Sequence, residues 1–319
     1  MSDYILEFEI PLKEIEDKIS SLKSTGIKTG MDVSEGIAQL EKELEEKKTN
    51  IYNNLSRWQR VQLARHPKRP YSLDYITRIT TYWFELHGDR YFGDDPSMVC
   101  GIGIIDNVKI MIISQEKGRG TKEKVYRNFG MARPEGYRKA LRLMKLAEKY
   151  NIPVLTLIDT PGAYPGLGAE ERGQAQAIAN NLLEMSRLKV PIINVVIGEG
   201  ASGGALGIGV GDIILCFENT WYSVISPEGC ATILFRDAGR ASEAADSMKV
   251  TAMDLKEMGI ADIIMNEPLG GTHQNYDEAS LTLKSQIINS ITNLEQLTSD
   301  KLIENRIKKY KNMGKWING

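Results

Sequence analysis

Apolar residues near the N-terminus recur at helical spacing in a strongly charged background. Pro11 suits the first turn of a helix that carries Ile15, Ile19 and Leu22 on one face. A second helix is expected to follow, with Ser34 as its cap. Its apolar residues recur at mostly three- and four-residue steps: Ile37, Leu40, Leu44, Ile51, Leu55 and Trp58. Such a hairpin must bury its apolar stripe, either on its own chain or on a partner chain.

Two prolines within residues 66–70 end this region, because a helix interior excludes them. We therefore expect a helical extension over residues 1–65 and a main domain with C-terminal helices over residues 66–319. The basic end of the last predicted helix, residues 281–315, is typical of a solvated face. That end contains Arg306, Lys308, Lys309, Lys311 and Lys315.

The apolar period changes after Met98. Residues 99–105 and 108–113 are rich in β-branched residues and are separated by Asp106-Asn107, which predicts a hairpin. Helices and short apolar strands then alternate, which predicts an α/β core. The predicted helices cover residues 134–150 and 170–188 and a short segment after Gly203, and the predicted strands cover residues 154–158, 192–197 and 213–217.

In α/β sheets, ligands bind beyond the carboxyl ends of the strands. This rule indicates two loops, residues 159–168 and 198–204. Gly198-Glu199-Gly200-Ala201-Ser202-Gly203-Gly204-Ala205 lies between a strand and a short helix. Glycines let a ligand approach the main chain, and free N–H groups at a helix start stabilise developing negative charge, as in an oxyanion hole. The alternative is a tight turn with close helix packing.

The loop at residues 158–168 has no charged group after Asp159. It suits a pocket wall, and it equally suits a plain connection. Asp159-Thr160-Pro161-Gly162 matches a GTPase motif, but the phosphate loop that such an enzyme needs is missing upstream. Gly200 to Gly204 matches the G-x-S-x-G elbow of serine hydrolases, for which only His273 follows the serine as a partner.

Composition limits the function further. The chain has 319 residues and a net charge of −2, so neither nucleic acid nor an anionic membrane is expected as the main partner. No apolar run reaches the roughly 20 residues that span a bilayer. Met1 to Tyr4 lack an export signal, and three widely spaced cysteines suggest neither a disulfide framework nor a zinc site. We expect a cytoplasmic protein.

Basic residues gather between the predicted hairpin and the first α/β unit, from Lys117 to Lys145. An anionic substrate such as a coenzyme A ester would account for them. A solvated helix face is the alternative, and we prefer it after Ala140.

Several long motifs along the chain carry a resemblance. They are Lys122 to Lys124, Arg127 to Met131, Pro134 to Leu143, Ile158 to Gly168, Ala169 to Gln174, Gly198 to Gly204 and Tyr222 to Ala231, with shorter matches at residues 63–67, 69–71 and 267–271. In this order they resemble the alpha subunits of the acetyl-coenzyme A carboxylase carboxyltransferase of bacteria and plastids. The resemblance extends over nearly the whole chain and makes the serine elbow a coincidence.

The resemblance implies a crotonase-type α/β fold, a ββα spiral, in the main domain. It also implies a beta subunit with a zinc ribbon, with which the active site is shared, so that zinc belongs to the partner and no cofactor is intrinsic to this chain. Biotin on the biotin carboxyl carrier protein, loaded by biotin carboxylase, would deliver its carboxyl group to acetyl-CoA. The product, malonyl-CoA, begins fatty acid synthesis.

The implied reaction passes through two oxyanions, one on the biotin ureido group and one on the thioester. From the match at Gly198 to Gly204, the resemblance implies that the amides of Gly203 and Gly204 are the catalytic hydrogen-bond donors to the biotin oxyanion. It implies that the beta subunit provides the donors to the thioester oxyanion. The expected substrate- and biotin-binding residues are Gly162, Tyr164, Pro165, Gly166, Gly168, Gly200, Ser202 and Arg133.

Two rival functions remain open at this stage. A self-sufficient hydratase or isomerase of the same fold would need a carboxylate such as Glu199 or Glu170 as acid or base. A non-catalytic scaffold would use the glycine loops for packing alone.

Overall fold

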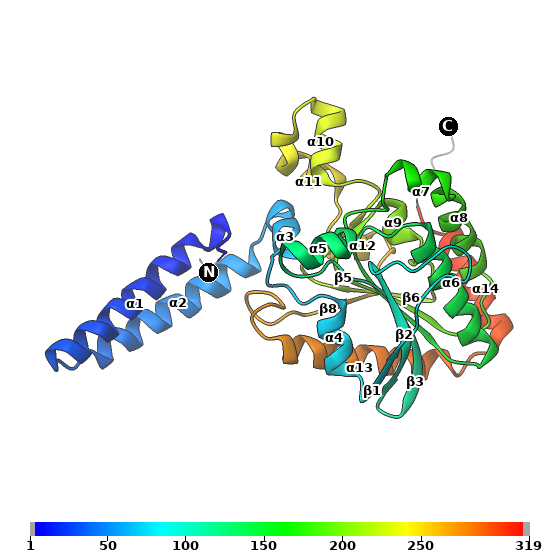
Figure 1. The fold of residues 1–319 in the computed structure, drawn as a ribbon. Coiled ribbons are helices and arrows are strands. Elements are labelled where there is room, and N and C mark those ends of the chain that lie inside the picture. The colour runs from blue at the N-terminus through cyan, green and yellow to red at the C-terminus, as the bar shows by residue number, and fades with distance from the viewer. Residues whose placement is uncertain (1–3, 315–319) are drawn as a thin grey trace.

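An eight-stranded mixed sheet forms the centre of the molecule, and helices cover both of its faces (Figure 1). The computed structural model describes residues 4–314; the expectations that concern Met1 to Asp3 and Lys315 lie outside them. The strand order is β1-β2-β3-β4-β5-β6-β8, with β7 paired to β5, and the pairs are parallel beyond β3. The strands are β1 (Tyr82–Glu85), β2 (Met98–Ile105), β3 (Val108–Gln115), β4 (Val154–Thr160), β5 (Ile192–Ala201), β6 (Ile213–Phe217), β7 (Trp221–Ser223) and β8 (Ile263–Met265).

The predicted hairpin and the predicted α/β core are both confirmed. β2 and β3 pair antiparallel, and Asp106 and Asn107 between them have φ of 45° and 70°, the two positive values that a tight hairpin turn requires. Every residue of β4 and β5 is buried, as expected for parallel strands covered on both faces.

Two buried apolar clusters lie on the two faces of the sheet. Helices α6 and α8 contribute to one cluster, and α4 and α13 to the other. The main helices are α1 (Ile10–Thr29), α2 (Ser34–Asn53), α3 (Arg57–Ala64), α4 (Ser72–Ile79), α5 (Gly120–Tyr126), α6 (Pro134–Lys149), α7 (Leu167–Glu171), α8 (Gln174–Met185), α9 (Ser202–Leu206), α10 (Pro227–Phe235), α11 (Ala241–Met248), α12 (Ala252–Glu257), α13 (Tyr276–Leu294) and α14 (Ser299–Lys311).

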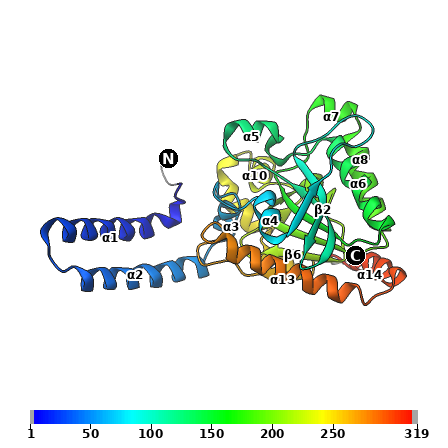
Figure 2. The same ribbon diagram turned by 60° about the horizontal axis from the view of Figure 1, so that its bottom comes forward.

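The predicted N-terminal hairpin is present, and α1 and α2 project together from the body (Figure 2). Two details of the prediction were wrong. Ser34 is the first helical residue, and Val33 occupies the cap position. The second helix also ends before Leu55 and Trp58, because the Ser56 hydroxyl accepts a hydrogen bond from the Gln59 amide at 3.2 Å and starts a new helix, α3.

Part of the apolar stripe of this hairpin is buried within the chain itself. Leu12, Ile15 and Ile19 of α1 are buried. At the base of the hairpin, Leu6, Leu12, Tyr52, Leu55 and Leu63 form a small buried cluster that includes α3. Near the far end of the hairpin, Ile27 is 87% exposed.

Two predicted long helices are each divided in two. The helix expected over residues 170–188 consists of α7 and α8, which are separated at Gly173, whose φ of 81° does not fit a helix. The helix expected over residues 281–315 consists of α13 and α14, and the Thr298 hydroxyl caps the second by accepting from the Lys301 amide at 3.3 Å. Arg306, expected on a solvated face, is buried. No helix within residues 4–314 is long and apolar enough to cross a membrane.

Candidate functional site

A bulge shapes the carboxyl ends of β4 and β5. Ile158 pairs with Val196 and Thr160 pairs with Gly200, so that one residue of β4 faces three residues of β5. Side chains accept hydrogen bonds from two amides at the bulge. Asp159 Oδ1 accepts from the Glu199 amide at 2.9 Å, and Gln115 Oε1 accepts from the Asp159 amide at 3.2 Å. Bulges bend strands and re-aim the residues after them, often beside active sites.

The sequence predicted that this strand ends at Ile197. In the structure β5 continues past the bulge to Ala201. The segment Glu199 to Ala201 pairs with β7, which supplies the ladder that a loop would lack. Helix α9 starts at the next residue, Ser202. The first amides of a helix have no acceptor within the helix, and in α9 these include the amides of Gly203 and Gly204.

The two glycines of α9 differ in their surroundings. A Cβ at Gly204 would collide with the backbone of Gly162 and Ala163, so close packing of the two glycine loops requires glycine there. A Cβ at Gly203 would approach nothing more closely than the Ile178 side chain, at 3.6 Å. Packing therefore explains Gly204 but does not explain Gly203.

A cavity of about 280 Å³ lies beside Gly203. Its lining is mostly apolar, and no residue of the lining carries a charge at neutral pH. Burial raises the pKa of the Tyr222 hydroxyl well above its usual value, which keeps that group neutral. The cavity is lined by Ser202, Gly203, Leu206, Tyr222, Ser223, Val224, Leu255 and Ile260.

The second predicted loop divides into two parts. Gly162 packs against α9. The remainder, Tyr164 to Gly168, lies near the start of α6: the Tyr164 amide donates to the Ala132 carbonyl at 3.0 Å, and the Arg133 guanidinium lies 4.9 Å from the Tyr164 ring centroid. Of the predicted binding residues, Ser202 lines the cavity beside Gly203. Seven do not line it: Gly162, Tyr164, Pro165, Gly166, Gly168, Gly200 and Arg133.

A buried cluster of charges lies behind the bulge. Glu199 accepts from Arg65 Nε at 2.5 Å and from Lys117 Nζ at 2.6 Å, and Lys117 Nζ also lies 2.7 Å from Asp159 Oδ1. Burial alone would raise the pKa of Glu199, but Lys117 and Arg65 outweigh it and hold that pKa below its usual value. The Glu199 carboxylate is therefore ionised, and both of its oxygens accept hydrogen bonds. Glu170, the other carboxylate considered for a hydratase, is exposed on α7.

This cluster borders a second cavity of about 200 Å³, which is lined by Ala64, Arg65, Tyr71, Lys117, Lys124, Phe129, Pro161 and Glu199. Several basic residues that we associated with an anionic substrate are paired instead. Arg127 Nε bonds Glu123 at 3.0 Å, and Arg138 Nε bonds Asp89 at 2.8 Å. Lys117 is held by Asp159 and Glu199.

Comparison with known proteins places these features in a family. A family model described as "Acetyl co-enzyme A carboxylase carboxyltransferase-like" matches residues 5–314. The chain is 52% identical over 313 residues to the acetyl-coenzyme A carboxylase carboxyl transferase subunit alpha of Staphylococcus aureus (strain bovine RF122 / ET3-1), with 98% of this chain and 100% of that protein covered. The chain belongs to this carboxyltransferase family. The same protein from strain MRSA252 is equally similar, at 52% identity.

Solved structures agree with the fold expected for the acetyl-CoA carboxylase carboxyltransferase family. A transcarboxylase 12S with methylmalonyl-coenzyme A bound matches 72% of this chain with a TM-score of 0.59 and 18% identity, and the chain spans 42% of that protein. A Pseudomonas malonate decarboxylase hetero-tetramer in complex with coenzyme A matches 74% of this chain and 91% of its own, with a TM-score of 0.57 and 15% identity. The fold is the crotonase-like fold of carboxyltransferases.

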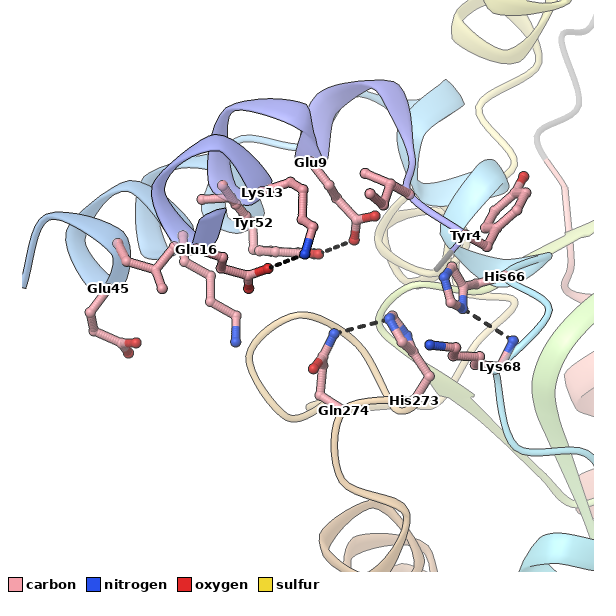
Figure 3. A pocket seen from close by; sticks show the side chains of 14 residues that line it. Tyr4, Glu9, Lys13, Glu16, Glu45, Tyr52, His66, Lys68, His273 and Gln274 are labelled. Carbon is pink, nitrogen blue, oxygen red and sulfur yellow. Dashed lines mark hydrogen bonds and ion pairs between the residues drawn. The ribbon is translucent and has the colours of Figure 1, made fainter. Parts of the chain in front are cut away.

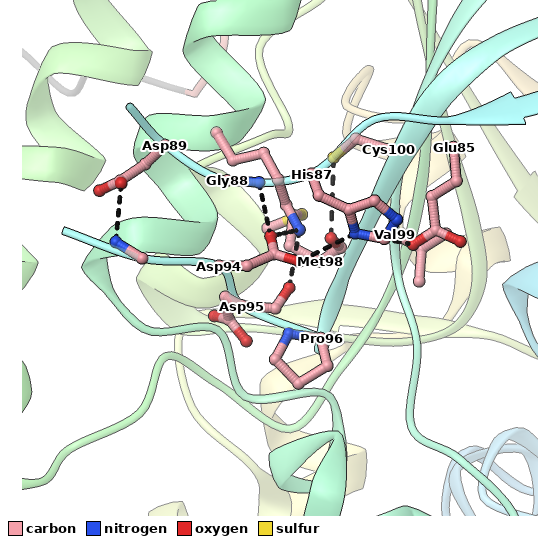
Figure 4. A network of polar contacts seen from close by, with 12 residues as sticks. Glu85, His87, Gly88, Asp89, Asp94, Asp95, Pro96, Met98, Val99 and Cys100 are labelled. Atoms are coloured by element: carbon pink, nitrogen blue, oxygen red, sulfur yellow. Dashed lines mark hydrogen bonds and ion pairs between the residues drawn. The ribbon is translucent and has the colours of Figure 1, made fainter. Parts of the chain in front are cut away.

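None of the three histidines of this carboxyltransferase-family chain lines the cavity at Ser202. His66 and His273 stack with ring centroids 3.9 Å apart in a cavity of about 270 Å³ at the base of the N-terminal hairpin (Figure 3). His87 lies in the loop before β2, where its Nδ1 is 2.9 Å from Asp94 Oδ2 (Figure 4). No described residue lining the cavity at Ser202 could act as the base of a serine triad.

Ser202 nevertheless has φ of 59°, a value that an elbow serine would also show. Replacing it with glycine, which accepts this φ, separates the two interpretations. A carboxyltransferase should lose roughly ten-fold or less in rate, because at most one hydrogen bond disappears. A serine nucleophile would lose about 10⁴-fold or more. The rate of carboxyl transfer by the Ser202→Gly variant decides between them.

The sequence did not indicate several residues of this site. Tyr222, Leu255 and Ile260 come from β7, α12 and the segment after α12, and reach the cavity only through the tertiary fold. Gln115 was also missed. Its position at the end of a strand, as a polar residue after an apolar run, was the available signal.

Proposed function

We propose that this chain acts as the alpha subunit of an acetyl-CoA carboxylase carboxyltransferase. It takes part in the transfer of a carboxyl group from carboxybiotin to acetyl-CoA, which forms malonyl-CoA for fatty acid synthesis. The observation that carries the proposal is Gly203: a glycine that packing does not require, at the start of a helix and in the wall of a cavity. A ligand that must approach the main chain accounts for it.

The cavity beside Gly203 fits the ring system of biotin. That ring system is neutral and largely apolar, and so are the side chains of Leu206, Tyr222, Val224 and Leu255 around it. Carboxybiotin on its carrier protein supplies the carboxyl group: its N–C bond breaks, a C–C bond forms at the acetyl methyl carbon, and the methyl proton passes to the biotin nitrogen. Biotin and its carrier are thus substrates for this chain.

The backbone of α9 has a defined part in this reaction. Negative charge that develops on an oxygen in the cavity would be stabilised by the amides of Gly203 and Gly204, which are fixed before the reaction starts. No side-chain acid or base is needed for this stabilisation. Ser202 remains a proposed contact for biotin in this cavity. The proposed substrate contacts outside the cavity are Gly162, Tyr164, Pro165, Gly166, Gly168, Gly200 and Arg133.

Exposed apolar residues at the cavity and on α10 support a site that a second chain completes. Val224 at the cavity is 81% exposed, and Ile233 and Leu234 on α10 are 71% and 62% exposed. Helices α10 and α11 stand out together from the body of the molecule (Figure 1). The proposed occupant is a beta subunit with a zinc ribbon, which would bind the thioester. Biotin carboxylase and the biotin carboxyl carrier protein complete the proposed set of partners, in the cytoplasm.

The proposal assigns no metal to this chain. Within residues 4–314, no group of three or more histidine, cysteine or acidic side chains could hold a metal ion. Cys100, Cys216 and Cys230 are free thiols, and burial raises the pKa of the first two to about 12.

The proposed function is tested by assaying the purified chain alone and after mixing with its beta subunit. The substrates are malonyl-CoA and biocytin, and formation of acetyl-CoA is measured. We expect transfer in the mixture and none from either chain alone. Hydration of an enoyl-CoA by the chain alone would contradict the proposal, and stable association without transfer would indicate a scaffold.

A further inference from the structure

Gln115 connects the two backbone segments that form the candidate site. It is the last residue of β3, and its side chain is fully buried. Its Nε2 donates to the Gly204 carbonyl at 2.7 Å, and its Oε1 accepts from the Asp159 amide at 3.2 Å. One side chain thus joins α9 to the bulge at the end of β4.

Helix α9 depends on such contacts for its orientation. It has only five residues, two of them glycine, and so short a helix has little stability of its own. Side chains from other elements bond one carbonyl within α9 and two carbonyls just after it. Tyr137 Oη donates to the Gly204 carbonyl at 3.2 Å, Asn181 to the Gly207 carbonyl at 2.9 Å and Asn194 to the Ile208 carbonyl at 3.0 Å. Of the bonds to these three carbonyls, the one from Gln115 is the shortest, and of these side chains Gln115 is the one that also bonds the Asp159 amide.

We propose that Gln115 is a positioning residue for carboxyl transfer, which aims the free amides of α9 at the developing oxyanion. This inference rests on the proposed function. The physical reason is that an oxyanion donor works only at hydrogen-bond distance from the charge, and a misplacement of about 1 Å can cost on the order of 100-fold in rate. A donor on the Gly204 carbonyl also polarises the short hydrogen-bonded segment around it.

The test compares Gln115→Met and Gln115→Glu with the wild type, each in complex with the beta subunit, over a range of pH. Methionine cannot donate to Gly204, so kcat should fall by about 10- to 100-fold at every pH, with KM for malonyl-CoA unchanged. A buried glutamic acid has a raised pKa, and its neutral form can both donate to Gly204 and accept from Asp159. The ratio of its kcat to that of the wild type should therefore rise as the pH falls, by up to about ten-fold per unit.

Other charged groups near position 115 are Glu116, Lys117, Asp159 and Glu199, and all of them are shared by the wild type. Dividing each rate by the wild-type rate at the same pH removes their contribution. A residue that only supports the fold would show a lower melting temperature and a ratio that does not depend on pH. That outcome, or a wild-type kcat in Gln115→Met, would overturn the inference.

A second variant keeps the test decisive if the methionine variant does not fold. Tyr137→Phe removes the longer bond to the same carbonyl and leaves Gln115 in place. We expect a loss of a few-fold in kcat, smaller than that of Gln115→Met, with KM unchanged. An unchanged kcat would show that the Gly204 carbonyl needs no such support. If the wild-type complex itself transfers no carboxyl group, the proposed function fails instead.

Discussion

Replacing Gly203 with valine should reduce carboxyl transfer by about 100- to 1,000-fold while the complex with the beta subunit still assembles. A helical Cβ leans towards the N-terminus of its helix, so the valine would overhang the free amides of the first turn. The nearest atom to such a Cβ belongs to the Ile178 side chain and is 3.6 Å away, so the Cβ itself causes no collision and we expect the complex to assemble. The measurement is kcat with malonyl-CoA and biocytin, together with the melting temperature and the elution volume of the complex.

Gly36 provides a matched control for this substitution. It also lies in a helix, α2, and a Cβ there would have no atom within 4 Å. Gly36→Val should therefore leave the transfer rate at the wild-type level. If Gly203→Val keeps full activity, the amides of α9 do not bind the oxyanion. Gly204→Val would be a weaker test, because its Cβ would push the two glycine loops apart.

Replacing Arg306 with leucine should lower the free energy of unfolding by about 3–5 kcal/mol. The guanidinium is buried, and it bonds Asp212 through Nε at 2.9 Å and through Nη2 at 2.7 Å. It also donates to the carbonyls of Met185, Leu188 and Val190 at 2.7, 2.8 and 3.0 Å. Leucine would leave a buried carboxylate and three carbonyls without these donors, and urea denaturation measures the loss.

Lys308, on the exposed side of α14, is the control for Arg306. Lys308→Leu should change the free energy of unfolding by no more than about 0.5 kcal/mol. The loss in the free energy of unfolding for Arg306→Lys should lie between these two values. A lysine keeps the charge but lacks the planar guanidinium that binds Asp212 with two bonds. Equal losses at positions 306 and 308 would contradict the role assigned to Arg306.

Much of the fold could be predicted from local pattern. The turn at Asp106-Asn107 was predictable because both residues tolerate positive φ between two β-rich runs. The buried parallel strands β4 and β5 were predictable because both of their faces are apolar. The breaks at Gly173 and Ser56 were missed, since each depends on one residue whose local conformation overrides an otherwise continuous apolar period.

Features that depend on pairing between distant segments were not predictable. The bulge between β4 and β5 results from how the two strands align, and neither sequence contains that alignment. Arg306 looked like part of a solvated basic face because its partner, Asp212, lies 94 residues away. The charge pattern of the helix alone could not show that this residue is buried.

The glycine segment, Gly198 to Gly204, was likewise predictable only in part. Its position after a buried strand, and the motifs around it, predicted a backbone site beyond the carboxyl end of that strand. The distinction between Gly203 and Gly204 required the tertiary structure, because it depends on where Gly162 and Ala163 lie. The role of Gln115 likewise depends on contacts with residues 44 and 89 positions further along the chain.

The central claim is that the Gly203 amide holds a biotin oxygen in the cavity beside α9. A crystal structure of the complex of this chain with its beta subunit, soaked with biotin, tests this claim most directly. We predict that the ureido oxygen lies about 2.7–3.1 Å from the Gly203 nitrogen, with the ring system against Tyr222 and Leu255. Biotin bound instead in the charged cavity at Lys117 and Lys124, with the α9 amides facing solvent, would contradict it.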